Sequence, residues 1–237
     1  MPQLRYAQLR YLAIVLLAWT TVFLLTRGAL LIAHWGDTSA GPVEILRIFA
    51  VGLVYDATFL LYAALPLGLY LLLCPQRLWR SRAHGVFLHL LLGISLFVML
   101  FTATAEWLFW DEFGVRFNFI AVDYLVYSEE VINNILESYP VYPLIAALAL
   151  VAVFLAVALR SPVSRALNAP LMPRKKALGA WSLLLAGALL ATLAINQNVP
   201  RGLGGNAYQN ELASNGPFQF FAAFRNNELD YMKFYAT

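Results

Sequence analysis

Charged residues are scarce in this chain of 237 residues: they make up 12% of the positions, whereas hydrophobic residues make up 61%. A soluble domain carries about 25% charged residues, so this chain has too few polar side chains to cover a surface that faces water. The formal net charge of +3 could suggest a nucleic-acid partner, but the basic residues are not gathered on a soluble face. The composition therefore argues against a soluble domain or a nucleic-acid-binding protein and predicts an integral membrane protein.

Cysteine and histidine are also rare. The single cysteine, Cys74, excludes an internal disulfide and a cysteine-based metal site, and its place at the end of an apolar run favours a packing role. His34, His84 and His89 lie at membrane boundaries or in an apolar run without an acidic cluster nearby, so we expect no metal site. The chain contains no G-x-S-x-G, H-E-x-x-H or phosphate-loop motif, and its residues alone indicate no catalytic centre.

What the chain does contain is long hydrophobic runs. A helix needs about 20 residues to cross a hydrocarbon core about 30 Å thick, and backbone groups in lipid must pair within their own segment. Five stretches meet this requirement: Leu9–Ala33, Ile45–Leu73, Val86–Phe109, Tyr142–Leu159 and Leu178–Ile195. We therefore predict an all-α, polytopic membrane protein with five transmembrane helices, the first of which is too long for a signal-peptide core and is retained.

The loops predict an orientation. Basic residues precede the first helix and follow the second and the fourth, whereas the loop from His34 to Glu44 has no Lys or Arg and the loop from Trp107 to Val141 has one. Cytoplasmic loops carry the excess of Lys and Arg. We expect the N-terminus on the cytoplasmic side and, with five spans, the C-terminus on the extracytoplasmic side.

Two extracytoplasmic segments stand apart from the predicted membrane domain of residues 1–196. Within residues 111–140, apolar residues recur every three or four positions, which suits an amphipathic helix on the membrane surface or, equally, a simple connector. Residues 197–237 are predicted to be a linker: a loop, then a helix that begins near Asn215 and Pro217. The aromatic face of that helix would rest at the lipid interface or pack on a neighbouring element.

Two ionisable residues interrupt the apolar runs. Asp56 lies about 16 Å, and Arg27 about 9 Å, from the outer ends of their predicted helices at 1.5 Å per residue. A charge at mid-bilayer costs at least about 2.5 kcal/mol, so a partner or a polar cavity is expected. The intramembrane pair Arg27–Asp56 could lock two helices together, form a headgroup or substrate pocket, or belong to a proton or ion path.

Two long motifs resemble a known family. "DEFGVRFNFIAVDYLVYSEEVINNILESYP", Asp111–Pro140, and "LASNGPFQFFAAFRNNELDYMKFY", Leu212–Tyr235, are similar to segments of the lipoteichoic-acid-synthase-like family. These proteins are sulfatase-type transferases of phosphoglycerol or phosphoethanolamine. The first motif resembles the family's segment after the third helix, and the second resembles its linker between membrane part and enzyme domain.

The resemblance implies a bacterial plasma (inner) membrane protein with a C-terminal extracytoplasmic domain of alkaline-phosphatase type. In the family that domain holds a divalent metal (Mn, Mg or Zn) and a threonine nucleophile, and transfers a headgroup from a phospholipid. Thr237 ends the linker, so no catalytic residue, metal ligand or cofactor is expected in this chain, which would be inactive alone. The implied partners are membrane phospholipids and the catalytic domain, or a separate partner enzyme.

Three outer-side cations, Arg47, Arg116 and Arg225, are the candidates for contacts with lipid phosphates. A local salt bridge is the competing interpretation for each, such as Arg47 with Glu44 at helical spacing, or Arg225 with a carboxylate that follows it. Two other functions stay open. The chain could be a stand-alone module that senses lipid or docks a partner, or, with less support, a small transporter, although it shows no inverted repeat.

Overall fold

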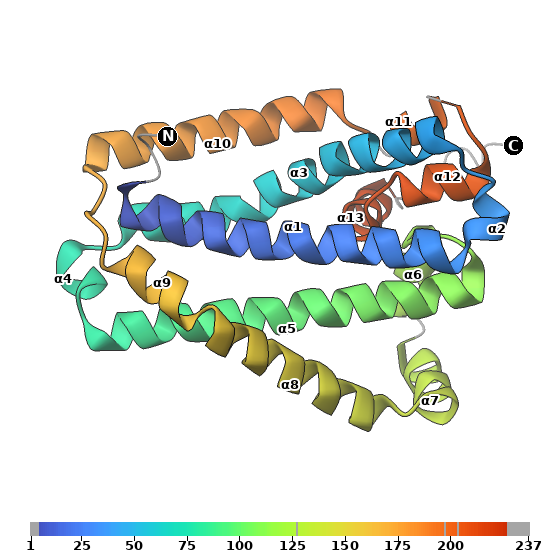
Figure 1. Cartoon of the computed structure of the whole chain (residues 1–237), viewed down its shortest axis with the longest axis horizontal. Helices are drawn as coiled ribbons and strands as arrows, with labels where there is room; N and C mark the ends of the chain where they lie inside the picture. The colour runs from blue at the N-terminus through green and yellow to red at the C-terminus, as the bar shows by residue number, and fades with distance from the viewer. Residues whose placement is uncertain (1–4, 127, 197, 203, 227–237) are drawn as a thin grey trace, which may run out of the picture.

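The computed structural model describes residues 5–126, 128–196, 198–202 and 204–226, and this part of the chain consists of helices and turns, with no strand (Figure 1). Within it, five helices are long and apolar enough to cross a membrane: α1 (Ala7–Ala33), α3 (Pro42–Leu73), α5 (Arg82–Phe113), α8 (Val141–Ala158) and α10 (Arg174–Ala194). They coincide with the five predicted stretches to within four residues at each end. For the described residues, the predictions of an all-α chain and of five helices able to span a membrane are confirmed.

The shorter helices gather at the two ends of this bundle. We call the end that carries the N-terminus of α1 the proximal end, and the opposite end the distal end (Figure 1). The shorter helices are α2 (Trp35–Thr38), α4 (Gln76–Trp79), α6 (Phe119–Val126), α7 (Ser128–Ser138), α9 (Arg160–Leu167), α11 (Val199–Gly202), α12 (Ala207–Leu212) and α13 (Gly216–Asn226). Of these, α4 and α9 lie toward the proximal end, and the others lie at or near the distal end.

Helix α1 is the centre of the bundle. It packs against α3, α5 and α9, while α8 packs on α5 and α10 packs on α3 (Figure 1). Two side-chain hydrogen bonds tie α1 to α5: the Tyr11 hydroxyl donates to the Leu88 carbonyl at 2.7 Å, and the Trp19 indole donates to the Ser95 hydroxyl at 3.3 Å. The apolar core therefore runs along α1, and α8 and α10 present most of their surface outward.

The region of residues 111–140 forms helices, as its periodicity predicted. Its first residues continue α5 to Phe113, where Gly114 takes a left-handed conformation (φ 67°) that ends the helix. Glycine adopts this conformation without the steric cost that a side chain imposes. Helices α6 and α7 follow. A membrane-surface position for them stays a prediction.

The five spanning helices differ in length. Helices α8 and α10 have 18 and 21 residues, whereas α3 and α5 have 32 each. At 1.5 Å per residue the two shorter helices measure about 27 and 32 Å, close to the thickness of a hydrocarbon core, and the two longer ones about 48 Å. The longer helices must therefore project beyond the hydrocarbon core or tilt strongly within it.

A buried charge network as the candidate functional site

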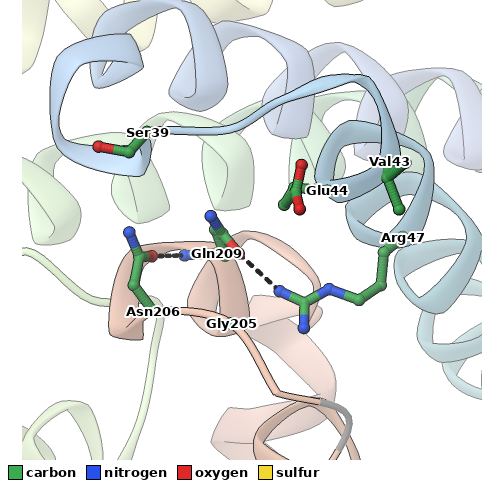
Figure 2. Close-up of a pocket in the computed structure, with 7 residues that line it drawn as sticks. All are labelled: Ser39, Val43, Glu44, Arg47, Gly205, Asn206 and Gln209. Atoms are coloured by element: carbon green, nitrogen blue, oxygen red, sulfur yellow. Dashed lines mark hydrogen bonds between the residues drawn. The ribbon is translucent and has the colours of Figure 1, made fainter.

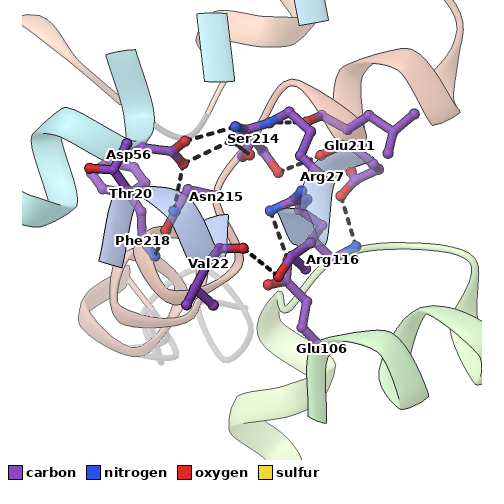
Figure 3. A network of polar contacts seen from close by, with 12 residues as sticks. Thr20, Val22, Arg27, Asp56, Glu106, Arg116, Glu211, Ser214, Asn215 and Phe218 are labelled. Atoms are coloured by element: carbon purple, nitrogen blue, oxygen red, sulfur yellow. Dashed lines mark hydrogen bonds and ion pairs between the residues drawn. The ribbon is translucent and has the colours of Figure 1, made fainter. Parts of the chain in front are cut away.

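Arg27 and Asp56 form a bidentate ion pair between α1 and α3. Arg27 Nη1 lies 2.7 Å from Asp56 Oδ2, and Arg27 Nη2 lies 2.8 Å from Asp56 Oδ1 (Figure 3). The exposed fraction is 0% for Arg27 and 1% for Asp56. The planar guanidinium matches a carboxylate with two parallel hydrogen bonds, a geometry that a lysine cannot supply. The structure therefore brings together the two charges that interrupt the apolar runs.

Arg27 also holds the chain between α12 and α13. Its Nε donates to the Leu212 carbonyl at 3.0 Å, and its Nη2 donates to the Ser214 carbonyl at 3.1 Å. These carbonyls lie at the end of α12 and in the turn that follows it, where helical partners run out. One side chain of the first spanning helix thus fixes a turn that lies 185 residues later in the sequence.

Asn215 completes the attachment from the other side. Its side-chain oxygen accepts from the Phe218 backbone N–H at 2.9 Å, which caps the N-terminus of α13 as the sequence predicted. Its side-chain nitrogen donates to Asp56 Oδ1 at 2.8 Å, so the cap residue is itself tied to the ion pair. The residue is fully buried. The start of α13 is therefore positioned by α3.

A second buried ion pair lies beside the first. Arg116, in the turn after α5, places Nη1 2.9 Å from Oε1 of Glu106 on α5, and both residues are 1% exposed. The Arg116 backbone N–H donates to the Glu211 carboxylate at 3.2 Å. Burial lowers the pKa of Arg116, and the neighbouring Glu106 carboxylate opposes that shift. The turn after α5 is thereby joined to α12 as well.

Together the two pairs form what we call the charge network: Arg27, Asp56, Glu106 and Arg116. It contains two cations and two anions, so the buried group carries no net charge. A buried ion is tolerated only when it is paired and hydrogen-bonded, because desolvation costs several kcal/mol per ion. The Arg27–Asp56 pair meets this condition through Leu212, Ser214 and Asn215, whereas Nε and Nη2 of Arg116 have no hydrogen-bond partner among the described residues. The charge network acts as a clamp that joins the spanning helices to the C-terminal segment, defined here as residues 207–226.

The charge network lies near the level at which α10 ends. Helix α10 ends beside it: the Tyr55 hydroxyl, next to Asp56, donates to the Asn196 carbonyl just after α10. If α10 crosses the hydrocarbon core, Asp56 lies level with its end. Helix α3 continues beyond this level to Pro42, and the depth of about 16 Å for Asp56 stays a prediction.

The three arginines proposed for lipid phosphates occupy different settings. Arg116 is buried in its ion pair, so its guanidinium does not face lipid in this structure. Arg47 donates to the Gln209 side-chain oxygen at 2.8 Å and to the Gly204 carbonyl, across a cleft between α3 and α12. Arg225 is exposed in the last turn of α13, and the carboxylates that follow it, Glu228 and Asp230, lie outside the described residues.

Arg47 borders a polar pocket at the distal end (Figure 2). The pocket has a volume of about 470 Å³ and is lined by Ser39, Val43, Glu44, Arg47, Gly205, Asn206 and Gln209. Gly205 has φ +96°, and the Arg47 guanidinium lies where a side chain at this position would point. At this φ a residue with a Cβ is strained, and its Cβ would also push the Arg47 guanidinium aside.

Sequence reasoning missed half of the charge network. Glu106 sits in the last third of an apolar run, in "FTATAEWLFW", which is the same signal that marked Arg27 and Asp56. It was overlooked because it lies close to the predicted end of its helix. Arg116 was assigned to the surface because it follows the helix, and no local pattern shows that its turn folds back over Glu106.

The chain was compared with models of protein families, with curated proteins and with solved structures, and none of them matches it. Among the described residues, no group of three or more His, Cys, Asp or Glu side chains could hold a metal ion. The resemblance to lipoteichoic-acid-synthase-like proteins therefore stays a hypothesis.

Proposed function

We propose that this chain is the membrane-anchoring domain of a lipid-headgroup transferase of the lipoteichoic-acid-synthase-like type. The observation that carries the proposal is the clamp by Arg27, which joins the spanning helices to the C-terminal segment through Asp56, Leu212 and Ser214. An anchor that only retained a protein in the membrane would need no such attachment. A buried, fully paired clamp is what fixes the position and direction of whatever follows α13.

The clamp serves catalysis through proximity. Holding an alkaline-phosphatase-type domain against the outer leaflet would present lipid headgroups to it at high local concentration. Arg47 and Arg225, at the distal end, are the cations we assign to lipid phosphates. Under this proposal the chemistry belongs to the catalytic domain with its divalent metal, and this chain supplies the placement of that domain.

The proposed function includes an orientation in the membrane. We place the chain in the bacterial inner membrane, with the proximal end in the cytoplasm and the distal end on the extracytoplasmic side. The support is the basic loops of the sequence: Arg77 lies in α4 at the proximal end, and Arg80 and Arg82 follow it. A cysteine introduced at Arg80 should then resist a membrane-impermeant maleimide in intact cells, whereas one introduced at Asp37 should react.

A second candidate function is a stand-alone module that senses lipid or docks a partner enzyme. The pocket beside Arg47 favours it, since Glu44 and Arg47 give one cavity both charge signs at the distal end. The two functions differ in what the gene encodes. A stand-alone module requires a stop codon soon after Thr237, whereas an anchoring domain requires an open frame that continues into an enzyme-sized domain.

The test combines the gene with an assay. The product of the uninterrupted frame and the 237-residue chain are each reconstituted with labelled phospholipid, and headgroup transfer is measured. We expect transfer by the longer product and none by the 237-residue chain. Transfer by the 237-residue chain alone, or a native stop codon directly after Thr237, would contradict the proposal.

A further inference from the structure

We propose that α13 is a lipid-embedded interfacial helix, whose side chains Phe221 and Phe224 contact the acyl chains of the distal leaflet. The inference concerns the surface of α13 itself and does not depend on the transferase. Both phenylalanines are 61% exposed, although their helix is held against the bundle by buried residues. Three features of the structure indicate that these rings contact lipid rather than water.

The first feature is the setting of the helix. On its inner side, Phe218 and Ala222 are 8% and 7% exposed, and the Phe218 ring packs edge-on against the Tyr55 ring at 5.0 Å between centroids. The charge network fixes the start of the helix through Asn215. Figure 1 shows α13 nearly end-on while the spanning helices run across the picture, so its axis lies crosswise to the bundle. A helix crosswise to the spans lies along a membrane surface.

The second feature is the level of the helix along the bundle. The Phe221 ring stacks near the Phe59 ring of α3, with 6.5 Å between centroids. Phe59 lies between two contacts of α3 with α10: Tyr55 bonds to Asn196 just after α10, and Tyr62 bonds to Thr192 at 2.9 Å within its last turn. Phe221 is therefore level with the last turn of a helix that is only long enough to cross the hydrocarbon core.

The third feature is the surface at that level. Leu193, in the last turn of α10, is 85% exposed, and neighbouring Leu189 and Leu190 are 58% and 65% exposed. Phe221 lies at the level of this apolar surface along the bundle, as the contacts of Phe59 and Tyr62 show, and an exposed apolar band of spanning helices is covered by lipid. The same medium that surrounds Leu193 then surrounds the two rings, and aromatic side chains are favoured at the edge of the hydrocarbon core.

Because the sequence contains a single cysteine, one substitution gives a cysteine-free background for site-specific labelling. In a Cys74→Ala background, Phe221 and Phe224 are replaced one at a time by cysteine, spin-labelled and reconstituted in vesicles of phosphatidylethanolamine and phosphatidylglycerol. Collision rates with oxygen, which partitions into lipid, and with a water-soluble nickel chelate are then compared. Matched controls are Leu150 on α8, which is 72% exposed within a span, and Asp37 in α2, whose side chain is 56% exposed.

We expect the labels at 221 and 224 to behave like the label at 150, with more oxygen than nickel collisions. Nickel accessibility equal to that at position 37 would place the rings in water and overturn the proposal. Low accessibility to both reagents would overturn it as well, because protein would then cover the face. A Phe224→Trp variant gives a second readout without a label: added tryptophan emission quenched by dibrominated acyl chains supports the proposal, and unquenched emission contradicts it.

Discussion

Arg27 shows how one residue can join distant parts of a chain. Its guanidinium reaches Asp56 on α3 and two carbonyls of the C-terminal segment, and none of these contacts is exposed to water. Because hydrogen bonds to charged groups are stronger in such surroundings, the loss of one partner costs more than the pair contributes relative to apolar replacements. Predictions at the residue scale follow from this asymmetry.

Replacing Asp56 with asparagine should destabilise the protein strongly. The variant leaves the Arg27 charge buried without its counter-ion, which costs about 3–5 kcal/mol when a buried pair is broken. Thermal unfolding in detergent measures the effect, with Asp37→Asn as the control because Asp37 is exposed on α2. The control should change stability by less than about 0.5 kcal/mol. Equal melting temperatures for the two variants would show that the Arg27–Asp56 pair contributes nothing.

Alanine substitutions at two glycines in spanning helices should affect stability differently. A Cβ at Gly52 would lie 2.3 Å from Arg27 Cζ, whereas a Cβ at Gly28 meets nothing within 4 Å. Gly52→Ala should therefore displace the guanidinium and destabilise the protein by about 1–3 kcal/mol. Gly28→Ala should be neutral or stabilise α1 by up to about 1 kcal/mol. The difference in melting temperature between the variants is the measurement, and a Gly52→Ala variant as stable as Gly28→Ala would refute the close packing.

From the sequence, a buried charge could be recognised only where it interrupts an apolar run. Arg27 and Asp56 stand inside apolar runs and could be recognised as in need of partners. Glu106 carried the same signal near a helix end, and Arg116 carried none. Contacts with Leu212 and Ser214 use backbone carbonyls, which every residue has, so no side-chain pattern could identify them.

Helix α13 illustrates how an element is fixed by its first residues. Asn215 caps it and also donates to Asp56, so one amide joins local helix formation to the tertiary clamp. Element positions were predictable where they depend on local chemistry: the cap at Asn215 and the five apolar runs. Element ends were less predictable where polar residues continue a helix beyond the apolar run, as at Pro42 and Phe113.

Substitutions at Asn215 should separate the two roles of its side chain. Asn215→Ser keeps a capping oxygen and loses the donor to Asp56, so we expect a loss of about 1 kcal/mol, the worth of one hydrogen bond. Asn215→Asp also keeps the cap, but it places a second carboxylate against Asp56 in a buried site. It should therefore destabilise more than the serine variant, by thermal unfolding at neutral pH. An aspartate variant at least as stable as the serine variant would contradict contact with Asp56.

At the scale of the whole molecule, the five-span bundle supports the C-terminal segment at one end. The short helices α8 and α10 match the membrane thickness, and the longer α3 and α5 reach further toward the distal end. Composition and run length were sufficient to predict the five candidate spans, because a helix that crosses lipid needs about 20 mostly apolar residues and must pair its backbone groups internally. The return of α12 and α13 to the bundle was not predictable, since it depends on contacts between residues about 100 to 185 positions apart.

The central claim is that the Arg27 clamp holds the C-terminal segment on the spanning helices. Hydrogen exchange of the intact chain in lipid vesicles, followed by mass spectrometry, tests it through the amides of residues 212–218. Wild type and the control Arg80→Met, which alters an exposed proximal arginine, should both protect these amides. Arg27→Met should accelerate their exchange by about 100-fold, as expected when about 3 kcal/mol of local stability is lost. Unprotected amides in the wild type, or equal protection in Arg27→Met, would contradict the clamp.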